Sequence, residues 1–327
     1  MTALASPRAI APHRITAMIL RYWYLLMSSW PRLLELIYWP ALQIITWGFL
    51  QNYITQNANF FARAGGVLVG AVILWDILFR GQLGFSISFL EEMWARNLGN
   101  LMMSPLKPIE FLIALMVMSV IRLAIGVVPM TGLAMVFFDF NLYGIGFPLI
   151  AFFCNLIFTS WAVGIFVSGL VLRHGLGAES IVWTLMFGLM PLTCVYYPVT
   201  VLPYWLQYVA WALPPTYVFE GMRALLMQHV FRADLMVGAL AINAILLMGS
   251  FAIFSTLRIL SSGISISLAS SSGVGSRPNC WSIWREMRLS LLIVSIMCTG
   301  IRMVRAWSAI ERVMAWRIHH VAYVENL

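Results

Sequence analysis

Two opposite charges inside an apolar stretch have the clearest capacity for chemistry in this sequence. Asp76 and Arg80 lie one helical turn apart in a run of otherwise mostly apolar residues. A charge in lipid is costly, so such side chains face a bundle interior or water and usually pair. Asp before Arg at this spacing favours an ion pair, with Arg122 as a candidate third partner. The sequence leaves open whether the pair is structural or takes part in the activity of the protein.

Residues for other kinds of chemistry do not gather in the sequence. There is no evident carboxylate pair, His cluster or nucleophile beside a base, and no two of the four cysteines form a C-x-x-C pair. A phosphate-binding loop needs Gly-Lys-Ser/Thr, whereas Lys107, the only lysine, lies between Leu106 and Pro108. The sequence therefore predicts no metal site, no cofactor in this chain and no ATPase site of its own.

The composition indicates a protein that lies in a membrane. Of the 327 residues, 61% are hydrophobic and 10% are charged, whereas soluble domains are about 25% charged. The net charge of +8 does not indicate nucleic-acid binding, because the basic residues stand beside apolar runs. In that position they suit lipid headgroups and set the topology.

Six apolar stretches are long enough to cross a bilayer, which takes about 20 residues. We therefore predict an all-α integral membrane protein with six transmembrane helices. Small residues at Ser160, Gly164 and Ser168 lie on one helical face, as is typical of a contact between helices in a membrane. The predicted spans are residues 33–54, 65–83 with a possible extension to 90, 109–138, 147–172, 180–197 and 235–257.

Segments on either side of these spans differ from them in composition. Residues 8–31 alternate Arg with apolar residues at helical spacing, which predicts an amphipathic helix on the membrane surface. Residues 261–276 are rich in Ser and Gly and are typical of a flexible linker. We thus divide the chain into an N-terminal helix, 1–32, a six-helix domain, 33–260, and a tail, 261–327, to which we assign no function.

The distribution of basic residues predicts the orientation. With the N-terminus inside, eight basic residues fall on the inner side and three on the outer side, which satisfies the positive-inside rule. The inner residues are Arg8, Arg14, Arg21, Arg32, Arg96, Lys107, Arg173 and Arg258, and the outer ones are Arg63, Arg223 and Arg232.

A polar segment, residues 91–108, separates the second and third spans. We expect Gly99 to break it into two short pieces and Leu98, Leu101 and Met102 to form an apolar stripe. Glu110 falls in the first turn of the next helix, where its charge suits the helix dipole. An amphipathic helix of this kind can dock into a groove on a partner; an ordinary interfacial loop is the alternative.

A second segment, residues 198–231, is rich in proline and aromatic residues. Pro203 can open a short helix that Pro214 and Pro215 must end. Thr216 can cap the following helix, and Glu220 and Arg223 lie one turn apart on it. Trp and Tyr side chains suit a membrane interface, so a simple interfacial loop is again the alternative.

Both segments resemble the ABC-2 family of ABC transporter permeases, and the resemblance covers about residues 10–260. The first matches through Arg96, Gly99-Asn100-Leu101, Ser104-Pro105 and Glu110; the second matches "LP-x-W-L" at residues 202–206 and the Pro215 to Arg223 spacing. Asn100, where Thr is commoner, resembles the branch that exports polysaccharides and lipo-oligosaccharides.

The resemblance implies a role for each segment. In the family the first segment is a coupling helix that contacts the ATPase. The resemblance therefore implies a coupling role for Glu91, Glu92, Arg96, Asn97, Gly99, Asn100, Leu101, Ser104 and Pro105. The second forms short re-entrant helices on the outer side. The resemblance therefore implies that Pro203, Trp205, Pro214, Pro215, Glu220 and Arg223 belong to this outer re-entrant segment.

The resemblance also implies an activity. It indicates a permease subunit, not an enzyme, in the inner membrane of a bacterium, working as a homodimer with a separate ATPase subunit that binds ATP and Mg. The cargo would be an amphipathic or lipid-linked molecule such as a polysaccharide, a lipo-oligosaccharide or a drug-like compound. One alternative is an ion-gradient-driven transporter, which predicts several intramembrane acids where only Asp76 is clearly placed. A lipid-modifying transferase would need clustered acids or His at one membrane face.

Overall fold

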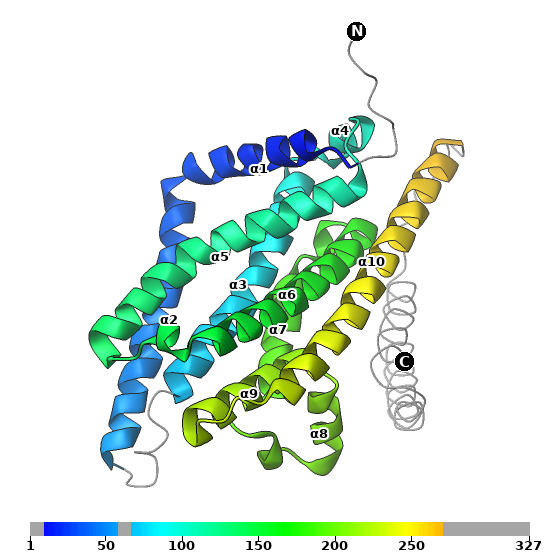
Figure 1. Cartoon of the computed structure of the whole chain (residues 1–327). Helices are drawn as coiled ribbons and strands as arrows, with labels where there is room; N and C mark the ends of the chain where they lie inside the picture. Colours follow the sequence, from blue (N-terminus) through cyan, green and yellow to red (C-terminus); the bar gives the residue numbers. More distant parts are fainter. Residues whose placement is uncertain (1–9, 58–66, 271–327) are drawn as a thin grey trace, which may run out of the picture. The chain divides into compact units, whose positions relative to one another are not determined.

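The computed structural model describes residues 10–57 and 67–270, and every regular element in these ranges is helical (Figure 1). Five of the described helices are long and apolar enough to cross a membrane. These findings confirm an all-α integral membrane protein. The five helices are α2 (Trp30–Asn57), α3 (Val67–Trp94), α5 (Pro108–Phe138), α6 (Phe147–His174) and α10 (Ala233–Ser270).

Shorter elements lie at the two ends of this bundle (Figure 1). At one end, which we call the α4 end, are α1 (Pro12–Met27) and α4 (Leu98–Met103). At the other, the α8 end, are α8 (Tyr204–Trp211) and α9 (Pro214–Gln228). The remaining elements are α7 (Ser180–Leu192) and the single turns η2 (Leu142–Ile145), η3 (Leu176–Ala178) and η4 (Val199–Val201).

The predicted fifth span is shorter than we expected. Helix α7 has 13 residues, or about 20 Å at 1.5 Å per residue, against a hydrocarbon core of about 30 Å. Pro191 lies in its last turn, and Cys194 adopts a positive φ of 55°. The ladder continues past Pro191, since the N–H of Thr193 donates to the carbonyl of Leu189 at 2.9 Å. The left-handed conformation of Cys194 then ends it, and the mostly apolar residues 193–197 leave the helix.

The last described helix extends past the predicted sixth span. Helix α10 continues to Ser270, so the first ten residues of the segment that we interpreted as a flexible linker are helical. Serine has only a modest helix penalty, and extending an existing helix is far easier than starting one. Residues 271–327, which hold the rest of the tail, lie outside the described residues.

Helix α3 forms the centre of the bundle. Its spanning stretch is 78% buried, compared with 17% for α2. Small residues let its neighbours approach closely: a β-carbon on Gly81 would lie 2.5 Å from Ser160 of α6, and one on Gly84 would lie 3.1 Å from the backbone of Ser119 in α5. In return, Gly164 of α6 receives the ring of Phe85. Close backbone approach of this kind is how membrane helices gain packing energy.

A proline, a glycine and an arginine meet where α2, α3 and α5 converge. Pro40 cannot donate to the carbonyl of Leu36 one turn earlier in α2. Gly126 of α5 faces that carbonyl, since a β-carbon on Gly126 would lie 2.9 Å from the Leu36 oxygen. The same β-carbon would lie 3.2 Å from Cδ of Arg80. The absence of a side chain at Gly126 therefore leaves room for the Arg80 side chain beside the Leu36 carbonyl, to which Pro40 cannot donate.

Candidate functional site

Glu92, near the end of α3, is a buried acid that joins three elements at the α4 end. Its two carboxylate oxygens accept hydrogen bonds from the guanidinium of Arg21 in α1, at 2.6 and 3.1 Å. The side-chain amide of Asn97 also donates to it, at 2.8 Å. Only 1% of the Glu92 side chain is exposed, so its charge depends on these partners. Burial, together with the charge of Glu92, raises the pKa of the neighbouring Tyr22 well above its usual range.

Glu91 binds two further arginines. Arg32, in the first turn of α2, donates to it at 3.1 Å, and Arg122 of α5 donates to both of its oxygens at 3.0 and 3.1 Å. Arg122 is therefore a partner of Glu91 and not, as we expected, of Asp76, because Glu91 offers it both carboxylate oxygens whereas Asp76 is bound by Arg80 of its own helix. We call Arg21, Arg32, Glu91, Glu92 and Arg122 the arginine–glutamate network; it ties α3 to α1, α2 and α5.

A third acid fixes the start of α1. Glu110, in the first turn of α5, accepts the backbone N–H groups of Lys107 and Ala11, each at 2.9 Å. Arg14 lies 3.7 Å from the same carboxylate and donates to the carbonyl of Pro105 at 2.7 Å. The predicted interaction of Glu110 with its helix start is thus made through specific N–H groups, and it anchors α1 beside α4.

We expected the chain to turn at Gly99, but the turn between α3 and α4 occurs earlier, at Arg96. Helix α3 ends at Trp94, and Arg96 takes a left-handed φ of 51°. The N–H of Asn97 then reaches back to the carbonyl of Glu92 at 3.0 Å, which is how helices commonly end. Gly99 lies inside α4, and a β-carbon added to it would have no neighbour within 4 Å. Arg96 therefore makes the turn that we assigned to glycine.

The two faces of α4 are opposite to our expectation. Leu98 and Leu101 pack against the chain's own hydrophobic core, so this part of the predicted stripe is not free to dock on a partner. Ser104 closes the helix by donating to the carbonyl of Leu101 at 2.6 Å. An exposed surface runs from the end of α3 through the following turn to the outer side of α4, and we call it the α4 face; its residues are Trp94, Ala95, Arg96, Gly99, Asn100 and Met103. The side chain of Met102 lies outside the described part.

The intramembrane charges Asp76 and Arg80 meet within α3. The Nε atom of Arg80 donates to Oδ2 of Asp76 at 2.6 Å. Asp76 is fully buried and Arg80 is 9% exposed. The second carboxylate oxygen, Oδ1, has no hydrogen-bond partner. The arrangement neutralises both charges while leaving one acceptor unused.

The proline-rich segment begins α9 differently from our expectation. Helix α8 follows Pro203 and ends at Trp211, and Pro214 and Pro215 are the first two residues of α9. Thr216 does not cap α9: the N-cap is Leu213, and the Thr216 hydroxyl has no partner. Prolines lack the N–H groups that a cap would satisfy, so a capping side chain has less to bind. On α8, Tyr204, Trp205 and Tyr208 are exposed.

Glu220 and Arg223 fasten the turn after α7 to α9. They form an ion pair at 2.8 Å, and Glu220 also accepts the N–H of Val199 at 2.8 Å. Arg223 donates to the carbonyls of Cys194 and Val195, the latter at 3.0 Å. Burial lowers the pKa of Arg223, and the nearby Glu220 opposes that shift.

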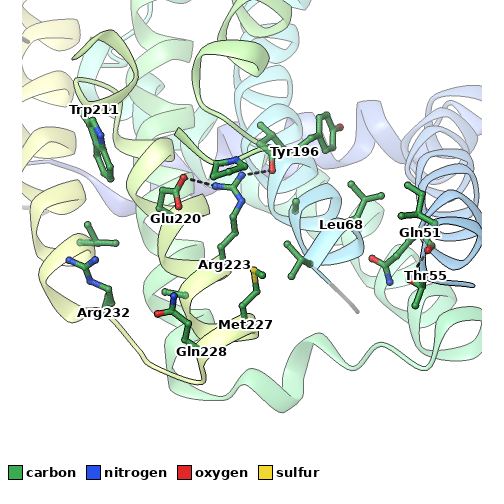
Figure 2. A pocket seen from close by; sticks show the side chains of 17 residues that line it. Gln51, Thr55, Leu68, Tyr196, Trp211, Glu220, Arg223, Met227, Gln228 and Arg232 are labelled. Carbon is green, nitrogen blue, oxygen red and sulfur yellow. Dashed lines mark hydrogen bonds and ion pairs between the residues drawn. The ribbon is translucent and has the colours of Figure 1, made fainter. Parts of the chain in front are cut away.

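A cavity of about 960 Å³ opens beside this pair at the α8 end (Figure 2). Helices α2, α3 and α9 contribute its walls. The side chains that line it are Gln51, Ile54, Thr55, Val67, Leu68, Ala71, Val195, Tyr196, Pro198, Trp211, Glu220, Arg223, Ala224, Met227, Gln228, Arg232 and Leu235.

Sequence reasoning missed a buried polar contact between α6 and α10. The side-chain amide of Asn243 donates to the carbonyl of Asn155 at 2.9 Å, and its oxygen accepts the hydroxyl of Thr159 at 2.7 Å. Both asparagines are buried. Asparagine within an apolar stretch is a usable signal for such a contact, because polar groups in a membrane bind across helices.

Comparison with known proteins identifies one matching family. A family model described as ABC-2 type transporter matches residues 16–227. The match covers more than half of the chain and reaches from α1 to α9. No curated protein matches the chain.

Proposed function

Since the chain belongs to the ABC-2 type transporter family, which makes it a permease subunit of an ABC-type transporter, we propose that it exports its cargo with energy from a separate ATPase. The observation that carries this proposal is the position of α4. One face of α4 is exposed and the other is held against the core. A helix that is held on one side and exposed on the other suits docking into a groove on an ATPase.

The arginine–glutamate network explains how a push on α4 would reach the membrane helices. Asn97, just before α4, binds Glu92, and Glu92 binds Arg21 of α1. Its neighbour Glu91 binds α2 and α5 through Arg32 and Arg122. Movement of α4 would therefore shift four helices together as a rigid body, which is how transporters alternate between access states.

The orientation and the partner subunit follow from charge and exposure. The inner side in our count of basic residues includes Arg14 and Arg21 in α1, Arg32 in the first turn of α2, and Arg96 and Lys107, which stand on either side of α4 in the chain. We therefore propose that the α4 end faces the cytoplasm of a bacterium and that α8 lies on the outer side. Helix α2, with only 17% of its spanning stretch buried, leaves a large apolar face for lipid or for a second protomer of a homodimer.

The cargo that this arrangement suits is amphipathic or lipid-linked. A path between two protomers would be bordered by apolar helix faces, and the exposed aromatic side chains Tyr204, Trp205 and Tyr208 suit the membrane interface at its exit. We include polysaccharides, lipo-oligosaccharides and drug-like molecules in this class, and ATP with Mg would be bound by the ATPase.

Site-specific crosslinking tests the proposal. Met103, 84% exposed on the α4 face, is replaced by cysteine and crosslinked in membranes of the native host. We expect a crosslinked product that contains a polypeptide with ATPase motifs, identified by mass spectrometry. Val230, 52% exposed near the α8 end, provides the matched control, Val230→Cys, which should give no such product. An ATPase crosslinked equally from both positions, or from neither, would contradict the proposal.

A further inference from the structure

The cavity at the α8 end is built as a ligand site. One face of α9 lines it through residues 220, 223, 224, 227 and 228, which recur at helical spacing. Gln51 of α2 helps to hold the opposite wall, because its side-chain oxygen accepts the N–H of Val69 at 3.0 Å. Tyr196 is held by stacking on Trp47, with ring centroids 4.6 Å apart. The walls are therefore fixed before a ligand enters, which lowers the cost of binding.

The size and lining of the cavity fit a largely apolar molecule. Its volume of about 960 Å³ lies in the range of small-molecule sites, roughly 300–1,000 Å³. Ligand sites of this kind combine an apolar lining with a few polar groups that orient the ligand. The apolar side chains here include Ile54, Val67, Leu68, Ala71, Met227 and Leu235.

The charges around the cavity favour an anion. Two guanidinium groups, Arg223 and Arg232, line it against one carboxylate, Glu220. Glu220 is already bound by Arg223 and by the N–H of Val199. Arg232 donates to both carboxylate oxygens of Asp234, at 3.3 and 2.5 Å, but the two side chains are 50% and 61% exposed, so solvent screens their attraction. The Arg232 guanidinium is therefore easily shared with an anionic group of a ligand.

The position of the cavity identifies the source of such a ligand. Its walls come from the last turns of α2, the first turns of α3 and the start of α10. These are ends of three membrane-spanning helices, so the cavity lies at the level where apolar chains give way to headgroups. We propose that this cavity binds a membrane phospholipid with an anionic head, its acyl chain between α2, α3 and α9 and its head beside Arg232 and Gln228 (Figure 2).

Native mass spectrometry of the full-length protein tests this site. Protein is stripped of lipid in detergent and titrated with phosphatidylglycerol or with zwitterionic phosphatidylcholine. We expect one saturable phosphatidylglycerol per chain, bound at least tenfold more tightly than phosphatidylcholine. Synthetic lipid contains no cargo, so binding here assigns the site to membrane lipid. Absence of a saturable lipid, or equal binding of both lipids, would overturn the proposal.

Two variants locate the binding. Ala224→Phe fills the cavity from α9 and should weaken phosphatidylglycerol binding at least tenfold, whereas Ala124→Phe, at an exposed position of α5, should not. Arg232→Gln should reduce the preference for the anionic head. Unchanged binding in Ala224→Phe would refute the site. Because these measurements need no ATPase, their failure would leave the proposed transport function standing, and the reverse also holds.

A labelling experiment avoids the risk that Ala224→Phe misfolds. Gln228 is exposed at the cavity, so Gln228→Cys can react with a maleimide in the folded protein, with the unsubstituted chain as the background. Phosphatidylglycerol should slow this reaction and phosphatidylcholine should not. Equal rates with the two lipids would count against the proposal.

Discussion

The guanidinium of Arg21 in α1 binds both carboxylate oxygens of Glu92 in α3, although the two residues are 71 positions apart in the chain. Paired hydrogen bonds of this kind are among the stronger ones in proteins and fix the relative orientation of their partners. The pair attaches α1 firmly to α3 at the end of the bundle where we propose that the ATPase docks.

Removing one partner of this pair should destabilise the protein. Arg21→Gln leaves the side-chain amide of Asn97 to bind the buried carboxylate of Glu92, and we expect a loss of about 1–3 kcal/mol, the usual cost of stranding a buried polar group. Arg21 is 37% exposed, so solvent moderates the effect. Thermal unfolding in detergent measures it. The control Arg232→Gln breaks an exposed pair and should leave the stability almost unchanged, because solvent screens such pairs; equal losses would argue against a structural role for Arg21.

Asp76 and Arg80 should behave as a coupled pair. Asp76→Asn and Arg80→Gln should each lower stability, and the double variant should recover part of the loss, because no buried charge is then left alone. A double-mutant cycle of unfolding measures the coupling. Strictly additive losses would mean that the side chains do not interact. A stable double variant that transports nothing would place the pair on the transport path, and a stable, active one would make it structural.

Gly126 should tolerate no larger residue. In Gly126→Ala the new methyl group meets the Leu36 backbone carbonyl at 2.9 Å, so α2 and α5 must separate. We expect a loss of about 1–3 kcal/mol, as is usual for overpacking, measured by thermal unfolding. Gly132 lies in the same helix with nothing within 4 Å. Its alanine variant should be neutral or slightly stabilising, and similar losses at both positions would rule out a specific contact.

The contact between Asn243 and Thr159 should stabilise the α6–α10 pair modestly. Hydrogen bonds between membrane helices contribute about 0.6 kcal/mol on average and about 1.7 at most. Asn243→Leu should therefore cost about 1–2 kcal/mol, since it also leaves the hydroxyl of Thr159 with only its own helix to bind. Thr256→Val, at an exposed position of the same helix, should cost almost nothing. A larger loss in Thr256→Val than in Asn243→Leu would contradict this assignment.

The sequence predicts the long helices well because their signals are local. The predicted span 109–138 agrees with α5, since Pro108 and Asp139 bound a long, mostly apolar run in which Glu110 and Arg122 are the charged residues. The fifth span was overestimated because hydropathy does not register that the positive φ of Cys194 ends the helix. Length and composition alone therefore support five of the six predicted spans within the described residues.

The candidate site was less predictable because its contacts join distant parts of the chain. Glu91 and Glu92 are evident as charges, but nothing local shows that Arg32 and Arg21, 59 and 71 residues away, bind them. The face of α4 was assigned wrongly for a related reason. Leu98 and Leu101 form an apolar stripe that fits a partner's groove as well as it fits the chain's own core, and only the packed structure distinguishes the two.

The junction of Pro40, Gly126 and Arg80 also constrains how this sequence can diverge. Replacing Pro40 would return the Leu36 carbonyl to the helical ladder, and replacing Arg80 would empty the space that Gly126 provides. A larger residue at position 126, however, requires both that Arg80 gives way and that the Leu36 turn of α2, which Pro40 shapes, moves. Relatives with another residue in place of Gly126 should therefore also differ at positions 40 and 80, although these sites lie in separate helices and far apart in the chain.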